Sequence, residues 1–138
     1  MPGVKDWIAK ASGDLKSSRK LIKDDDETLD SAAYFTQQSA EKALKAYLIF
    51  KQQPVQKTHD LDKLLKNCLT HDSAFDRLRE DVDVLSPFAT YSRYPDDRFH
   101  IDRKEVDEAI KRAEKILKFV KAKIESSEKT PQLDLFEI

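Results

Sequence analysis

The chain has 138 residues, a length that fits one domain of ordinary size. It contains only two glycines, Gly3 and Gly13, whereas β-rich folds need turn residues with positive φ at regular intervals, so sandwiches, barrels and glycine-loop nucleotide folds are disfavoured. Its 25 basic and 26 acidic side chains give a net charge of −1, which excludes a bulk basic field for nucleic acid but not a local basic site.

The first half of the chain predicts two helices. Apolar residues recur at steps of three and four over 4–23, which predicts the first helix. Four acidic residues follow at 24–27. The negative C-terminal end of a helix dipole disfavours carboxylates, so these residues are expected to form a loop. A second helix is expected to begin after Asp30 or Ser31, either of which can cap it, and to end near residue 52. Five alanines in this helix predict close approach by a neighbour: Ala32, Ala33, Ala40, Ala43 and Ala46.

Three further helical segments follow. A short helix is expected over 61–68 and another over about 73–84. Ser86 and Pro87 have the pattern of a cap followed by proline at the first helical position, so they are expected to restart or continue the helix through Tyr91. The last helix has the clearest pattern: Asp102 and Glu105 have the spacing of a capping box, and apolar residues then recur at helical spacing until Ser126. The helices together predict an all-α fold, an antiparallel up-and-down bundle of four to five helices.

The domain is expected over 4–126, with a linker and tail over 127–138. The single cysteine, Cys68, lies at an inward-facing helix position and is expected to be a core residue. A chain with one cysteine cannot form an internal disulfide, which is typical of proteins in a reducing compartment. No apolar run approaches 18 residues, and the first residues lack the apolar core of a signal peptide. The expectation is a cytoplasmic protein with no membrane association.

Three sequence stretches together resemble the HEPN family of small bacterial and archaeal helical-bundle proteins. They are Gln-Gln-Ser-Ala-Glu-Lys-Ala-Leu-Lys-Ala-Tyr at 37–47, Lys-Thr-His-Asp-Leu at 57–61 and Ser-Arg-Tyr-Pro-Asp at 92–96. The resemblance implies a homodimer and one of two roles. Many members are metal-independent endoribonucleases of toxin–antitoxin, defence or RNA-processing systems, with an Arg-x(4–6)-His motif; others resemble non-catalytic, nucleotide-binding partners of a minimal nucleotidyltransferase.

Arg93 and His100 are the candidate catalytic pair. Six residues separate them, at the outer limit of that motif. Cleavage of RNA through its own 2′-hydroxyl needs a proton-transfer group, which imidazole supplies near neutral pH, and a guanidinium matches the oxygens of the charged phosphorane. Pro95 interrupts the motif, so the alternatives are an ion pair between Arg93 and a following aspartate and a loop position for His100 beside Phe99.

Arg93, Tyr94 and Asp96 are the candidate contacts to nucleotide or RNA. Tyr94 has the aromatic ring to stack on a base, and packing at a dimer seam is the alternative.

Other polar residues are expected to be structural. His59 is expected to bond a neighbouring backbone carbonyl while Thr58 or Asp60 caps the following helix, and Lys42 and Lys45 are expected on a solvated helix face. The histidines lack the spacing of metal ligands, so neither a metal nor a cofactor is expected.

The C-terminal tail resembles a second kind of motif. Gln132, Leu133, Leu135 and Phe136 fall in the order Gln-Leu-Asp-Leu-Phe, similar to the pentapeptide with which bacterial replication and repair proteins dock on the sliding DNA clamp. A polar linker lets such a segment reach a partner groove. The alternative is that these apolar side chains pack back on the bundle or on the second protomer.

Overall fold

The computed structural model describes residues 2–91 and 100–129, and every regular element within these ranges is helical. The predicted all-helical bundle is therefore confirmed. The elements are α1 (Val4–Leu21), α2 (Leu29–Phe50), α3 (Leu61–Leu69), the 3₁₀ helix η1 (Ser73–Leu78), α4 (Arg79–Leu85), α5 (Phe88–Tyr91) and α6 (Arg103–Lys129).

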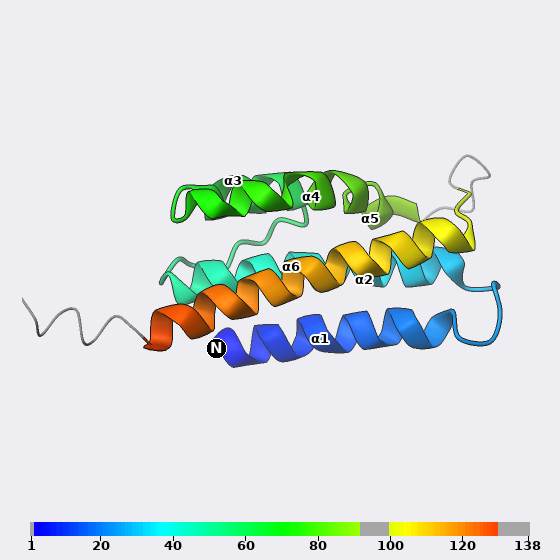
Figure 1. Ribbon diagram of the computed structural model, residues 1–138, viewed down its shortest axis with the longest axis horizontal. Helices are drawn as coiled ribbons and strands as arrows, with labels where there is room; N and C mark the ends of the chain where they lie inside the picture. The colour runs from blue at the N-terminus through cyan, green and yellow to red at the C-terminus, as the bar shows by residue number, and fades with distance from the viewer. Residues whose placement is uncertain (1, 92–99, 130–138) are drawn as a thin grey trace, which may run out of the picture.

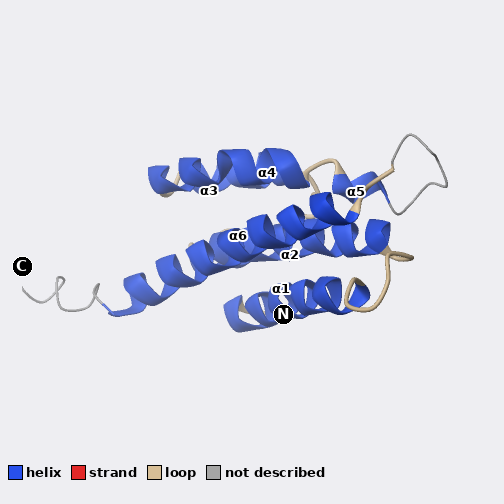
Figure 2. Ribbon diagram, turned by 45° about the vertical axis from the view of Figure 1, so that its right-hand side comes forward, coloured by secondary structure: helices blue, strands red, loops and turns tan. Residues whose placement is uncertain are grey.

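Helix α2 is the centre of the bundle. Helices α1, α2 and α6 pack against one another, and α3, η1 and α4 form a second layer over α2 and α6 (Figures 1 and 2). Helix α1 is antiparallel to α2 and α6, whereas α6 runs parallel to α2 (Figure 1). The connection over residues 51–60 runs back along α2, so that α3 also lies parallel to it (Figure 1). This long return places the start of α3 beside the middle of α2.

Small side chains let α1 and α2 approach closely, as the alanine spacing predicts. All five alanines of α2 are fully buried. Across the interface, the Ser18 hydroxyl donates to the Ala32 carbonyl at 2.8 Å, and the Ser39 hydroxyl donates to the Ala11 carbonyl at 2.8 Å. These bonds satisfy buried hydroxyls that would otherwise cost free energy.

Two helices, α3 and α6, begin at capping residues that the sequence alone predicts. Asp60 caps α3 by accepting from the amides of Asp62 and Lys63. Asp102 and Glu105 form the expected capping box at α6, with reciprocal bonds of 2.8 Å and 3.3 Å. Both signals lie within four residues, which is why the sequence predicts them.

The beginning of α2 differs from the prediction. It starts at Leu29 with Thr28 at the cap, before both expected capping residues. The Thr28 hydroxyl donates to the Leu21 carbonyl at 3.0 Å and so bonds the last turn of α1. A tertiary bond between consecutive helices therefore sets this boundary.

None of the described helices is long and apolar enough to cross a membrane.

Candidate functional site

The first candidate site lies at the end of the bundle where α6 begins. His100 is exposed, three residues before α6, and Ile101 beside it is buried in the core. Arg93, Tyr94 and Asp96 lie outside the described residues, so the structure gives the position of only one member of the expected catalytic pair. The burial of Ile101 fixes the backbone that presents His100 to solvent.

Acidic side chains surround His100 on this protomer. A hollow of about 290 Å³ is lined by Asp26, Glu27, Leu29, Asp30, His100 and Ile101. Arg103, in the first turn of α6, donates to the Ile22 carbonyl at 2.7 Å and pairs with Asp26 at 3.3 Å. Carboxylates therefore predominate in the described surface around His100, and Arg103 offsets the charge of Asp26.

The second candidate site is a histidine–carboxylate pair between α2 and the loop before α3. The His59 Nδ1 lies 3.0 Å from Oε1 of Glu41, and Lys45 Nζ lies 2.9 Å from the other carboxylate oxygen. The Glu41 side chain is only 3% exposed and that of Lys45 6%, whereas His59 is 63% exposed. A buried ion pair therefore holds one edge of an exposed imidazole.

Two expectations are wrong at this site. Lys45 and Glu41 are not on a solvated face, because α1 and the return loop cover them, and Lys45 Nζ lies 5.7 Å from the centre of the Trp7 ring. His59 bonds a carboxylate, not a backbone carbonyl; it is the His59 carbonyl that accepts a bond, from the Gln37 amide at 3.1 Å. The Glu-x-x-x-Lys spacing in the sequence is the only signal for this pair, and solvated helices share it.

A chain of hydrogen bonds continues from this pair toward α1. The Gln38 amide donates to the Gln37 side chain at 2.7 Å, and Lys42 donates to Gln38 at 3.2 Å and to Asp14 at 2.5 Å. Asp14 is 4% exposed and Gln37 is fully buried. The first sequence stretch of the family resemblance thus forms a polar network that connects α1, α2 and the return loop.

The geometry at His59 can support proton transfer. When Nδ1–H donates to Glu41, Nε2 is the unprotonated nitrogen and is free to accept a proton from solvent or a ligand. Glu41 lies twelve residues after Leu29, and at 1.5 Å per residue this places His59 about 18 Å from the His100 hollow. The two histidines therefore belong to separate sites within one protomer.

The remaining expected groups are structural. Cys68 is fully buried, and burial raises the pKa of its thiol to about 12, so it is a core residue as predicted. Among residues 2–91 and 100–129, no three histidine, cysteine or carboxylate side chains gather in a possible metal site.

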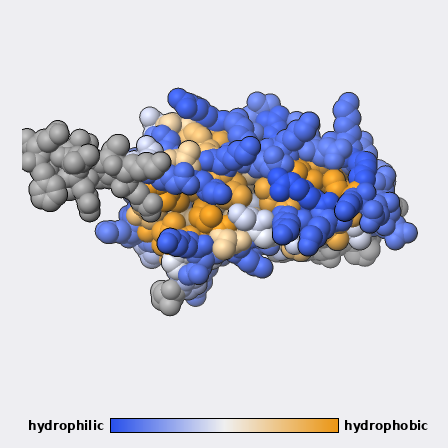
Figure 3. All heavy atoms as spheres, turned by 60° about the horizontal axis from the view of Figure 1, so that its bottom comes forward, coloured by the Kyte–Doolittle hydropathy of each residue, from blue (hydrophilic) through white to orange (hydrophobic). Residues whose placement is uncertain are grey.

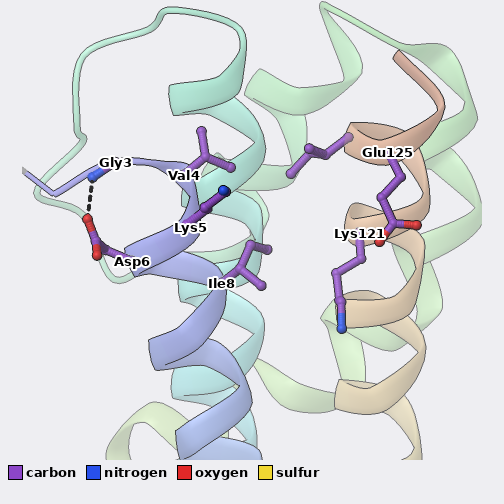
Figure 4. Close-up of a pocket in the computed structure, with 8 residues that line it drawn as sticks. Gly3, Val4, Lys5, Asp6, Ile8, Lys121 and Glu125 are labelled. Atoms are coloured by element: carbon purple, nitrogen blue, oxygen red, sulfur yellow. Dashed lines mark hydrogen bonds between the residues drawn. The ribbon is translucent and has the colours of Figure 1, made fainter. Parts of the chain in front are cut away.

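An apolar pocket lies at one end of the bundle, between the first and the last helix of the domain. Figure 3 shows the side of the bundle where α1 lies, with apolar patches between charged side chains. A pocket of about 490 Å³ separates the first turns of α1 from the last turns of α6; Val4 and Ile8 point toward it, with Lys121 and Glu125 across the gap (Figure 4). Gln132, Leu133, Leu135 and Phe136 follow α6 but lie outside the described residues.

Comparison with known proteins places these features in a family. The family model of the HEPN domain matches residues 4–123. The crystal structure of ST0689, an archaeal HEPN homologue, is 29% identical and covers 90% of this chain and 99% of its own, with a TM-score of 0.73. No curated protein matches the chain.

Proposed function

Because the chain belongs to the HEPN family, we propose that it works on RNA or nucleotides as a homodimer, and that it cleaves RNA without a metal ion. The observation that carries the proposal is the Arg93–His100 spacing, with His100 exposed where α6 begins. In the reaction, His100 takes the proton of the ribose 2′-hydroxyl and the 2′-oxygen attacks phosphorus. The bond from phosphorus to the 5′-oxygen breaks as the 2′,3′-cyclic phosphate forms, and the 5′-oxygen takes a proton from solvent and leaves as a hydroxyl. Arg93 stabilises the charge on the phosphorane.

In the proposed dimer, the second protomer offsets the negative charge of the hollow around His100. Two copies of the motif that face one another bring two arginines to one cleft, which offsets the carboxylates of Asp26, Glu27 and Asp30. Within the described residues of one protomer, the surface at this end is a poor one for phosphate.

The direct test is incubation of the purified chain with a labelled RNA in excess EDTA. We expect cleavage products with 2′,3′-cyclic phosphate ends, at a rate that EDTA leaves unchanged, and light scattering should give twice the chain mass of 15.9 kDa. A particle of single chain mass, or cleavage that EDTA abolishes, would contradict the proposal.

The alternative function is a non-catalytic partner of a minimal nucleotidyltransferase. The acidic hollow around His100 favours it, because such a surface complements a basic partner better than it complements phosphate. Calorimetry separates the two functions: nucleotide binding to the wild-type dimer with no cleavage of any RNA supports the partner role.

We also propose that the tail docks on the bacterial sliding clamp. A peptide of residues 129–138 should bind the clamp with micromolar affinity, because Leu135 and Phe136 can fill an apolar groove. The measurement is fluorescence anisotropy with the labelled peptide, and alanine at both positions should abolish binding.

The matched control for the tail is the same double substitution in the full chain. If it lowers the thermal midpoint by several degrees, the tail packs on the domain, for example in the pocket lined by Val4, Ile8 and Ile124. An unchanged midpoint together with lost peptide binding supports docking.

A further inference from the structure

The second half of α6 is strongly basic although the chain as a whole is not. From Lys111 to Lys123 there are six basic residues against one acidic residue, Glu114, while the net charge of the chain is −1. At 100° per residue, four lysines fall on one side of the helix: Lys104, Lys111, Lys115 and Lys118. They extend over about 21 Å along the helix axis.

Two of the acidic side chains beside this row are neutralised by arginines, while Asp107, one turn before Lys111, is exposed and forms no ion pair within the described part of the chain. Glu114 pairs with Arg19 of α1 at 2.6 Å, and Glu108 pairs with Arg112 at 2.9 Å. In contrast, Lys111 and Lys118 are exposed and form no ion pair within the described part of the chain. Their charges therefore remain available to an external anion.

An aromatic ring lies among these lysines. Lys111, Glu114, Lys115, Lys118 and Phe119 line a shallow hollow of about 470 Å³. The Phe119 ring is partly exposed and is held by Phe75 at 5.0 Å between centres in an edge-to-face arrangement. A fixed ring surrounded by cations is the combination with which proteins bind single-stranded nucleic acid, by stacking on bases and pairing with phosphates.

We propose that this surface, the lysine–phenylalanine hollow of residues 111–119, binds single-stranded RNA. The inference deepens the proposed function, because α6 starts three residues after His100 and a strand bound along the lysine row leads toward that histidine. The hollow supplies lysine cations, whereas carboxylates predominate in the described surface around His100. Lys111 and Lys118 contact phosphates, and Phe119 stacks on a base.

The test measures binding without cleavage. A fluorescein-labelled 12-nucleotide RNA with 2′-O-methyl groups, which cannot be cut, is titrated with the full-length chain at several NaCl concentrations and followed by anisotropy. We expect the double variant Lys111→Gln/Lys118→Gln to bind about tenfold more weakly at 0.1 M salt. Since each lost phosphate contact on a single strand changes the slope by about 0.7, the slope of log K against log salt should become less negative by about 1.4. Phe119→Leu should weaken binding by roughly fivefold with little change in slope.

The matched control is Lys57→Gln/Lys63→Gln, which removes one exposed lysine from the loop before α3 and one from α3 itself, neither of which forms an ion pair with another described residue. It should bind as wild type does. Equal loss in both double variants would mean that only net charge matters and would overturn the inference, as would wild-type protein that does not bind. If polyglutamate displaced the labelled RNA as strongly as unlabelled RNA does, the surface would be assigned to an acidic protein partner instead.

The result is independent of catalysis. If the wild-type chain binds the resistant RNA through Lys111 and Lys118 but cuts no RNA, the nuclease proposal fails and this inference stands. If the chain cuts RNA and the lysine variant binds and cuts as wild type does, the inference fails alone.

Discussion

Replacement of His100 by alanine should lower the rate of RNA cleavage by at least a factor of about 100, because a positioned proton-transfer group contributes about 10²–10⁴ to such a reaction. His100 is exposed, so the thermal midpoint should not change. Arg93→Ala should cause a loss of similar size, and Arg93→Lys should restore only part of the activity, since an ammonium lacks the planar fork that fits phosphate. Initial rates on a labelled RNA measure all three effects.

The matched control is His71→Ala. His71 is also exposed and lies in the turn after α3, at the opposite end of the bundle from the start of α6 (Figure 1). Its replacement should leave the rate unchanged. Full activity of His100→Ala would contradict the nuclease proposal and favour the partner role.

A mixture of two inactive variants shows whether the site is shared between protomers. When Arg93→Ala and His100→Ala chains are unfolded together and refolded, half of the dimers are mixed. If Arg93 of one protomer acts with His100 of the other, each mixed dimer regains one intact site, so activity should return to about a quarter of wild type. If both residues act within one protomer, the mixture should stay inactive.

The second large effect is expected at the buried pair of Glu41 and Lys45. Glu41→Gln keeps the shape of the side chain but leaves Lys45, whose side chain is 6% exposed, without a charged partner. Loss of one member of a buried pair costs about 3–5 kcal/mol, and we expect the free energy of unfolding in urea to fall by about 3 kcal/mol. The apolar double variant Glu41→Leu/Lys45→Met should be clearly more stable than Glu41→Gln.

The control for this prediction is Glu80→Gln, the same chemical change in an exposed pair. Glu80 is 78% exposed and lies 3.3 Å from Arg112, so its replacement should alter stability by less than about 1 kcal/mol. A Glu41→Gln variant no less stable than Glu80→Gln would show that water reaches Lys45. A double variant less stable than Glu41→Gln would show that the network, not the buried charge, supplies the stability.

The candidate sites were predictable to different degrees. His100 is a candidate from the sequence because the motif spacing is short, and the local capping box predicts where α6 begins after it. The pairing of His59 with Glu41 was missed, because seventeen residues separate them and a solvated Glu-x-x-x-Lys helix has the same pattern as a buried one. The lysine row of α6 was visible in the sequence, but the partial exposure of Phe119 and the pairing of Glu114 with Arg19 were not.

By itself the sequence determined the helical class, the capped beginnings of α3 and α6 and the inward faces, because periodicity and capping depend on residues within one or two turns. The tertiary structure alone decided the start of α2, the parallel placement of α3 and the burial of Glu41 and Lys45. All three depend on the return of residues 51–60 along α2 or on the contact of α1 with α2, and no local pattern encodes which face of a helix a distant segment will cover.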